Sequence, residues 1–170
     1  MAAAIHTPHS FAHERADRNA ADRERGAEPH RPNGVFGENL TTTGLEVTDA
    51  RIGERWCVGG ELLLEVTSPR VPCRTFQGWF DEPGRVKLLT RAAVPGAYLR
   101  DLTPGQIRAG DPVRVEHRPD HDVTVALMFH ALTTRRERLP RLLDAGPPLP
   151  AEARTKVLAH QEALTRAALR

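Results

Sequence analysis

The stretch with the clearest chemical potential in this sequence is the hexapeptide Ser68-Pro69-Arg70-Val71-Pro72-Cys73. Its two prolines stiffen the loop and remove two backbone donors, so Arg70 and Cys73 are held in a fixed relation. An arginine near a thiol favours the thiolate, which is both a nucleophile and a ligand for soft metals. The alternative interpretation is an inert cysteine that is buried in a proline-rich turn.

A second candidate site lies in residues 34–44, with the sequence Gly-Val-Phe-Gly-Glu-Asn-Leu-Thr-Thr-Thr-Gly. Glycines such as Gly37 let the backbone approach a ligand closely, and Asn39 and the threonines supply neutral hydrogen-bonding groups. A phosphate or the edge of a heterocycle would suit such a segment. Glu38 either acts as a general acid or base or satisfies backbone donors. The whole segment can also be a capped turn between two strands.

The remaining polar candidates are isolated residues. Arg100 either holds an anion or points outward from a strand into solvent. His117 and His121 are four residues apart, but the intervening Pro119 argues against a helix that would pair them as metal ligands. Cys57 lies within a predicted strand, where it is interpreted as a small apolar residue.

Composition excludes several classes of protein. The 170 residues, 39% hydrophobic and 27% charged, predict one folded domain with an appendage. The net charge of +2 gives no overall field for nucleic acid or anionic lipid, so neither is expected as a partner. No run of about 20 apolar residues is available to cross a membrane. Two cysteines are too few for a disulfide scaffold, which makes a reducing cytoplasm the expected location.

The composition and the hydrophobic periodicity change twice along the chain, which predicts three regions. Residues 1–32 are expected to be a remnant with a short helix over residues 11–24, because they contain few large apolar side chains. Residues 33–119 are predicted to form a body of short strands that are broken by glycine and proline. Residues 120–170 carry a helical period and are predicted to form a three-helix tail that takes no part in the site.

Local signals define the predicted elements. Strands are expected at 55–58, 61–66, 97–100 and 113–117, and Gly59-Gly60 predicts a hairpin because glycine accepts positive φ. Leu62, Leu64 and Val66 would share one face. A short helix over 82–91 is expected after a cap at Asp81.

The tail has its own start and stop signals. Asp120 or Asp122 is the expected cap of its first helix. The second helix would begin at Arg138 with Pro140 in its first turn, and the third would open at Pro150.

Four motifs occur in the order seen in one protein family. They are Gly34-Val35-Phe36-Gly37-Glu38-Asn39-Leu40-Thr41-Thr42, Ile52-Gly53-Glu54-Arg55-Trp56, Pro69-Arg70-Val71-Pro72-Cys73 and Pro95-Gly96-Ala97-Tyr98-Leu99-Arg100. Together they resemble the MOSC-domain proteins, which are named after the C-terminal domain of molybdenum cofactor sulfurase. Gly110-Asp111-Pro112 and His117-Arg118-Pro119, followed by the helical tail, are similar to the YiiM-like branch of that family.

The resemblance implies a mainly β fold, a MOSC-like β-barrel with a short N-terminal helix and a C-terminal three-helix tail. It implies a molybdenum cofactor (molybdopterin) and the reduction of N-hydroxylated compounds such as hydroxylaminopurines. In this chain the reactive cysteine and molybdenum ligand falls on Cys73, and the cofactor-binding positions fall on Gly37, Glu38, Asn39, Arg70 and Arg100. The implied partners are a small N-hydroxylated substrate and an electron-donor reductase, and open strand edges would allow a homodimer.

The start of the chain departs from the YiiM-like pattern. Where that branch has strands and a His-Gly-Gly segment, this chain has Ile5-His6-Thr7-Pro8-His9-Ser10, so the first strands are expected to be missing. Two alternatives to the reductase follow. One is a sulfur carrier or cofactor-binding module that uses Cys73 without turnover, and the other is an N-terminally truncated, non-catalytic remnant. Bound molybdenum would argue against the remnant, and turnover would argue against the carrier.

Overall fold

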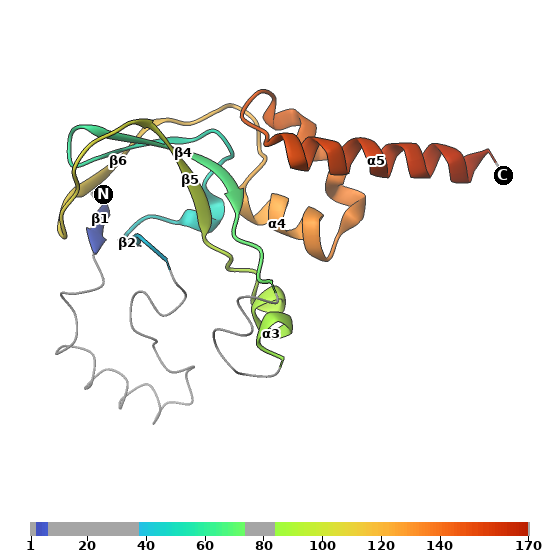
Figure 1. Cartoon of the computed structure of the whole chain (residues 1–170), viewed down its shortest axis with the longest axis horizontal. Helices are drawn as coiled ribbons and strands as arrows, with labels where there is room; N and C mark the ends of the chain where they lie inside the picture. Colours follow the sequence, from blue (N-terminus) through green and yellow to red (C-terminus); the bar gives the residue numbers. More distant parts are fainter. Residues whose placement is uncertain (1–2, 7–37, 74–83, 170) are drawn as a thin grey trace. The chain divides into compact units, whose positions relative to one another are not determined.

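The structure is a computed structural model that describes residues 3–6, 38–73 and 84–169, without the side chains of residues 3–6 and 85. Within these residues the strands are β1 (Ala3–His6), β2 (Thr41–Thr43), β3 (Arg55–Val58), β4 (Leu62–Pro69), β5 (Ala97–Thr103) and β6 (Pro112–His117). The helical segments are η1 (Val47–Asp49), α3 (Arg85–Ala92), α4 (Val125–Thr133), η2 (Arg136–Ala145) and α5 (Ala151–Ala168). Figure 1 shows their course along the chain.

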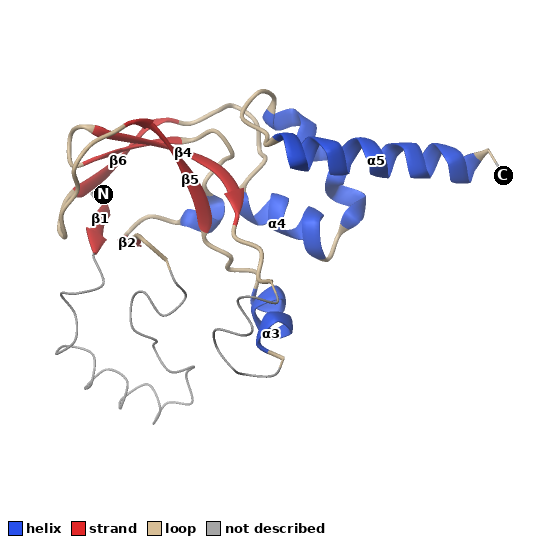
Figure 2. Ribbon diagram, in the orientation of Figure 1, coloured by secondary structure: helices blue, strands red, loops and turns tan. Residues whose placement is uncertain are grey.

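The strands form one antiparallel sheet in the order β2-β1-β6-β3-β4-β5. Among the described residues β2 and β5 are the two edge strands, and they do not pair with each other. The sheet is therefore open, and the predicted closed barrel is wrong. Closure requires edge strands with matching length and stagger, and β2 has only three residues. The helices make the fold mixed α/β rather than mainly β, as Figure 2 shows.

The chain divides into two compact units, which are described separately. The first unit comprises Met1–Leu45, Cys57–Leu62 and Pro104–Arg114. The second unit comprises Glu46–Trp56, Leu63–Thr103 and Val115–Arg170. Strands β3, β4 and β6 each run from one unit into the other along the chain.

Residues 3–6 form a strand, although the first strands were expected to be missing. In β1, Ile5 pairs with Thr42 of β2, and Ala3 pairs with Val113 of β6. The expectation is therefore wrong. An alanine-rich segment of four residues has little strand propensity of its own, and pairing with a neighbour on each side fixes its conformation. The helix predicted over residues 11–24 and the cap at Asp81 lie outside the described residues.

The β3–β4 hairpin forms where glycine predicted it. Gly59 has a φ of 68°, and its N–H donates to the Pro112 carbonyl at 3.0 Å. Leu62, Leu64 and Val66 are all buried, which confirms the predicted apolar face of β4. The other predicted strands appear as β5 and β6, and the predicted short helix appears as α3.

The three helical segments of the tail are confirmed, with two differences. Thr124, rather than Asp120 or Asp122, caps α4, because its hydroxyl accepts a hydrogen bond from the Leu127 N–H at 3.1 Å. The second segment, η2, is a 3-10 helix that contains Pro140 in its interior. This helix type occurs in short, irregular turns, which accommodate a proline better than a regular α-helix does. Both α4 and α5 pack against η2.

The tail shares a core with the strands of the second unit. The Ile52 N–H donates to the Val123 carbonyl at 2.9 Å, and the Val125 N–H donates to the Ala50 carbonyl at 2.9 Å. Large buried side chains come from strands and tail alike; they include Trp56, Leu64, Val66, Val123, Phe129, Leu142 and Val157. The tail therefore packs as part of this unit.

Gly53 is the position where backbone conformation and packing both demand glycine. Its φ is 87°, and a Cβ there would lie 2.7 Å from Cγ of Pro148, a ring that cannot move aside. We expect Gly53→Ala to lower the free energy of unfolding by about 2–3 kcal/mol in urea denaturation. Gly60→Ala is the control, because nothing lies within 4 Å of its added Cβ. Equal stability of the two variants would contradict this account.

Candidate functional site

The loop after β4 carries the first candidate residues. The Arg70 N–H donates to the Gly96 carbonyl at 3.2 Å, which ties the loop to the residue before β5. Arg70 is half-buried and Cys73 is exposed. The interpretation of Cys73 as a buried cysteine is therefore wrong.

Cys57 has a different environment. It lies half-buried in β3, and its sulfur accepts a hydrogen bond from Nη2 of Arg114 at 3.8 Å. Its predicted place in a strand is confirmed.

The two thiols are expected to differ in reactivity. Iodoacetamide should label Cys73 about tenfold faster than Cys57 in the folded protein, because the rate follows accessibility as well as thiolate character. Mass spectrometry of each peptide over time measures both rates. Faster labelling of Cys57 would contradict the assignment of Cys73 as the functional thiol.

The second candidate segment is described from Glu38 onward, and Gly37 lies outside the described residues. Glu38 is half-buried, and its Oε1 accepts a hydrogen bond from Oγ1 of Thr41 at 3.5 Å. Asn39 is exposed. These residues lead into β2 in the first unit, whereas Arg70 and Cys73 belong to the second. Glu38 and Asn39 are therefore described only within their own unit.

Arg100 belongs to a ladder of charges across three strands. It pairs in register with Glu65 of β4, and its guanidinium donates to the Glu65 carboxylate. Nε of Arg55 in β3 approaches the other oxygen of that carboxylate at 3.4 Å. Glu65 is only 3% exposed, whereas the Arg100 side chain is 58% exposed. The buried carboxylate therefore fixes one side of a guanidinium whose other side faces outward.

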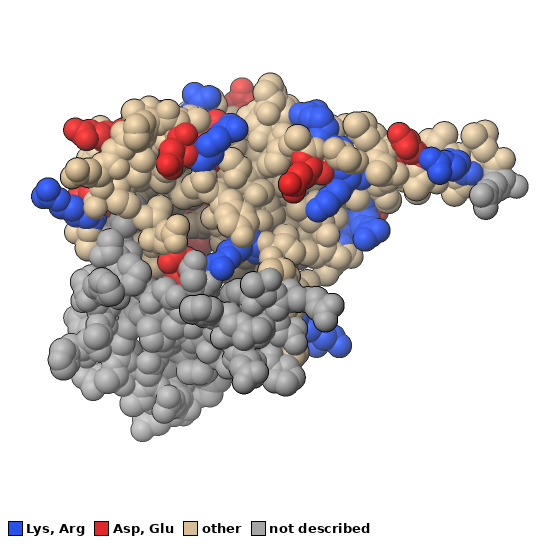
Figure 3. Space-filling view, viewed as in Figure 1, with Lys and Arg blue, Asp and Glu red and all other residues tan. Residues whose placement is uncertain are grey.

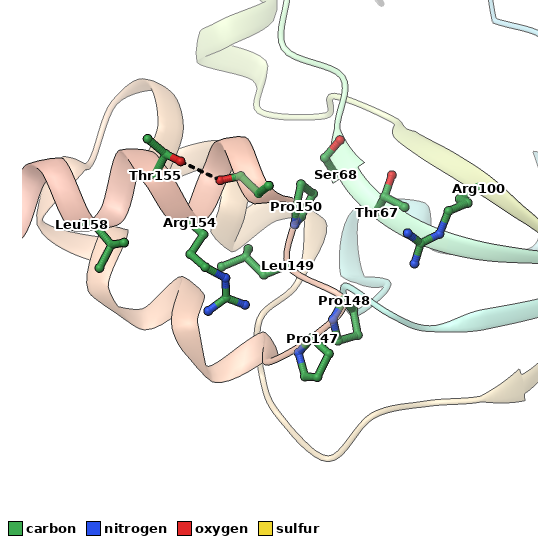
Figure 4. A pocket seen from close by; sticks show the side chains of 11 residues that line it. Thr67, Ser68, Arg100, Pro147, Pro148, Leu149, Pro150, Arg154, Thr155 and Leu158 are labelled. Carbon is green, nitrogen blue, oxygen red and sulfur yellow. Dashed lines mark hydrogen bonds between the residues drawn. The ribbon is translucent and has the colours of Figure 1, made fainter.

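Arg100 also lines a groove of about 740 Å³ within the second unit, shown in Figure 4. The lining comes from β4, β5, the residues before α5, and α5 itself: Thr67, Ser68, Arg100, Pro147, Pro148, Leu149, Pro150, Ala151, Arg154, Thr155 and Leu158. Of these, Arg100 was predicted from the sequence as a cofactor-binding residue, and Ser68 only as the start of the loop. The prolines of the segment Pro147–Pro150 predict the end of one helix and the start of the next, but no local pattern predicts that this segment faces β4.

The motif at residues 52–56 has a structural role. Glu54 is fully buried, and its carboxylate accepts hydrogen bonds from Nε1 of Trp56 at 2.8 Å and from Nε of Arg118 at 2.7 Å. Nη2 of Arg118 and the Arg51 N–H lie at 3.4 Å from the same carboxylate. Glu54 thus joins β3 to the segment that leads into the tail.

The structure also bears on other classes of site. Among the described residues no group of three or more histidine, cysteine or acidic side chains is arranged to hold a metal. His121 instead accepts a hydrogen bond on Nδ1 from the Val123 N–H at 3.2 Å. Acidic and basic side chains are interspersed on the face shown in Figure 3. Of the helices that the structure describes, none has the length and apolarity to span a membrane.

Comparison with known proteins decides the family. The MOSC domain model matches residues 9–114, which is more than half of the chain. The chain belongs to the MOSC domain family. The match includes the cysteine loop, β2 to β5 and the start of β6, whereas β1 and the helical tail lie outside it.

Two curated relatives of this MOSC protein are informative. Protein YiiM of Escherichia coli is 35% identical over 118 residues, which cover 66% of this chain and 50% of the relative. A Gibberella moniliformis protein named "Reductase" is 36% identical over 86 residues, which cover 51% of this chain and 15% of the relative. The chain therefore spans half or less of the length of these relatives.

Solved structures support the same assignment. YiiM from Geobacillus stearothermophilus matches with a TM-score of 0.71 and 26% identity, covering 85% of this chain and 74% of that one. YiiM from Escherichia coli matches with a TM-score of 0.69 and 25% identity, covering 88% and 75%. The coverage of this chain exceeds that of the MOSC model, so the YiiM-like fold extends over the tail as well as the sheet.

Proposed function

We propose that this MOSC protein binds a molybdenum cofactor and reduces N-hydroxylated compounds, hydroxylaminopurines among them. The observation that carries the proposal is the exposure of Cys73. This cysteine ends a loop that is stiffened by two prolines and that has an arginine, Arg70, three residues before the cysteine. The family membership and the relative named as a reductase support the same reaction class.

The residues present fit such a cofactor in chemical type. A thiolate is a soft ligand that suits a thiophilic metal, and Cys73 is accessible for that role. Arg70 offers a planar set of donors to an anionic group, and its backbone is fixed by the bond to Gly96. We assign Cys73 to the metal and Arg70 to the anionic part of the cofactor.

The reaction itself needs few protein groups. When bound, molybdenum supplies two electrons to the N–O bond, so that a hydroxylamine, two electrons and two protons give an amine and water. Arg70 would offer its positive charge to the anionic part of the cofactor from the loop that ends at Cys73. An electron-donor reductase is the partner that this scheme requires.

The test is turnover by protein purified from a host that makes the cofactor. With a chemical reductant in place of the partner, 6-hydroxylaminopurine should be converted to adenine. Chromatography measures the conversion over time. Bound molybdenum without any turnover would contradict the reductase and favour the alternative of a sulfur carrier or cofactor-binding module. Protein with neither molybdenum nor turnover would favour a non-catalytic remnant.

A further inference from the structure

The groove beside α5 has the composition of a binding site for an anionic organic molecule. Arg100 and Arg154 line it, and its lining contains no acidic side chain. Thr67, Ser68 and Thr155 add hydroxyl groups. Figure 4 shows Arg154 extending from α5 and Arg100 from the sheet, on opposite sides of Pro147 and Pro148. The hydroxyls of Thr67 and Thr155 donate to the carbonyls of Tyr98 and Ala151, so the donors suited to an oxyanion are the two guanidinium groups and the Ser68 hydroxyl.

Both arginines are held in place by other parts of the fold. Nη2 of Arg154 donates to the Gly146 carbonyl at 2.7 Å, and Arg100 donates to the buried Glu65. Each guanidinium makes this one hydrogen bond within the described part of the chain, so most of its five donors remain for a ligand. Because Glu65 offsets part of the charge of Arg100, Arg154 provides the less compensated charge.

A bulge in β4 explains why two consecutive hydroxyl residues line the groove. In the pairing of β4 with β5, Val66 lies opposite Leu99 and Ser68 opposite Tyr98, so Thr67 is an extra residue. Consecutive side chains of a regular strand point to opposite faces, and a bulge re-aims them. The bulge is thus the local feature that brings Thr67 and Ser68 to the same groove.

The size and the apolar lining indicate more than a free ion. A volume of about 740 Å³ is in the range of pockets that hold small organic ligands. Pro147, Pro148, Leu149 and Leu158 supply an apolar surface on which a flat or aliphatic group can lie. An organic molecule that carries a phosphate combines both features.

We propose that this groove binds a small phosphomonoester, with Arg154 and Arg100 on the phosphate and the proline surface on the organic part. The proposal goes beyond the reductase function and does not rest on it, because neither Cys73 nor molybdenum takes part. Arg100 is the one residue that the family resemblance also assigned to the cofactor, and Arg154 belongs to the groove alone. Failure of the groove to bind would leave molybdenum loading and turnover unaffected, and the two failures are therefore distinguishable.

The test is calorimetric titration of the whole chain with adenosine 5′-monophosphate, adenosine and inorganic phosphate at fixed ionic strength. The monophosphate should bind at least about tenfold more tightly than either fragment. Arg154→Gln and Arg100→Gln should each weaken its binding about tenfold, whereas Arg166→Gln, on the same helix outside the groove, should not. No binding of the monophosphate, or equal binding by wild type and groove variants, would overturn the proposal.

A second pair of variants covers the case in which loss of the Arg154–Gly146 bond unfolds the protein. Thr155 and Thr165 are both exposed on α5, and each hydroxyl donates to the carbonyl four residues earlier at 3.0 Å. Thr155→Glu places a negative charge in the groove, and Thr165→Glu places the same charge outside it. The monophosphate should bind about tenfold more weakly to Thr155→Glu only. Equal binding by both variants would contradict an anion site in the groove.

Discussion

Replacing Cys73 by serine is expected to abolish the reduction of 6-hydroxylaminopurine, with a loss in kcat/KM of about 100-fold or more. A serine hydroxyl stays protonated near neutral pH and is a hard ligand, so it can replace neither the thiolate nor its bond to a soft metal. Steady-state kinetics of the cofactor-loaded protein measures the effect. The exposure of Cys73 makes the substitution harmless to folding, and unchanged thermal unfolding would show this.

Cys57→Ser is the matched control for that experiment. Cys57 lies half-buried in β3, and its sulfur accepts a hydrogen bond from Arg114. The proposed chemistry assigns no role to this thiol. Its substitution should leave kcat/KM within about twofold of wild type. Full activity of Cys73→Ser, or a larger loss in Cys57→Ser, would contradict the proposed role of the loop thiol.

Glu54→Gln is expected to lower the free energy of unfolding by about 2–4 kcal/mol. The buried carboxylate accepts hydrogen bonds from Trp56, Arg118 and the Arg51 backbone. An amide NH₂ in place of one carboxylate oxygen would face an N–H donor and could not accept its hydrogen bond. The negative charge that compensates Arg118 would also be lost. Partial exposure of Arg118 lets water replace some of the lost interaction, which limits the loss.

Urea denaturation of Glu54→Gln beside Glu61→Gln provides the measurement. Glu61 lies exposed in the hairpin turn, so its substitution should change stability by less than about 0.5 kcal/mol. Similar stability of the two variants would show that Glu54 does not join β3 to the segment before the tail. Activity that falls only in proportion to the unfolded fraction would confirm that its role is structural.

Local patterns in the sequence were sufficient for the elements whose cause is local. Gly59-Gly60 predicted the hairpin because positive φ is a property of glycine, and the alternation of Leu62, Leu64 and Val66 predicted the buried face. The helical period after residue 120 predicted the tail for the same reason. The proline-rich loop after β4 predicted a fixed position for Cys73, although its exposure had to come from the structure.

The features that sequence reasoning missed depend on pairing between distant segments. The strand β1 exists because β6 and β2 lie beside it, and its own residues give little signal. The closed barrel was expected from family resemblance, and the length of β2 argues against it. The groove combines a bulge in β4 with the turn before α5, which are far apart in sequence. Thr124 was overlooked as the cap of α4 because Asp120 and Asp122 are equally good capping residues nearby.

The most direct test of the central claim is the molybdenum content of the purified protein. Wild type, Cys73→Ser and Cys57→Ser are produced in parallel in a host that makes the cofactor, and metal is counted per chain by mass spectrometry. The account predicts a molybdenum content near one per chain in wild type and Cys57→Ser, and about a tenth of that or less in Cys73→Ser. Wild-type protein free of molybdenum, or equal loading of Cys73→Ser, would contradict the assignment of this loop as the cofactor site.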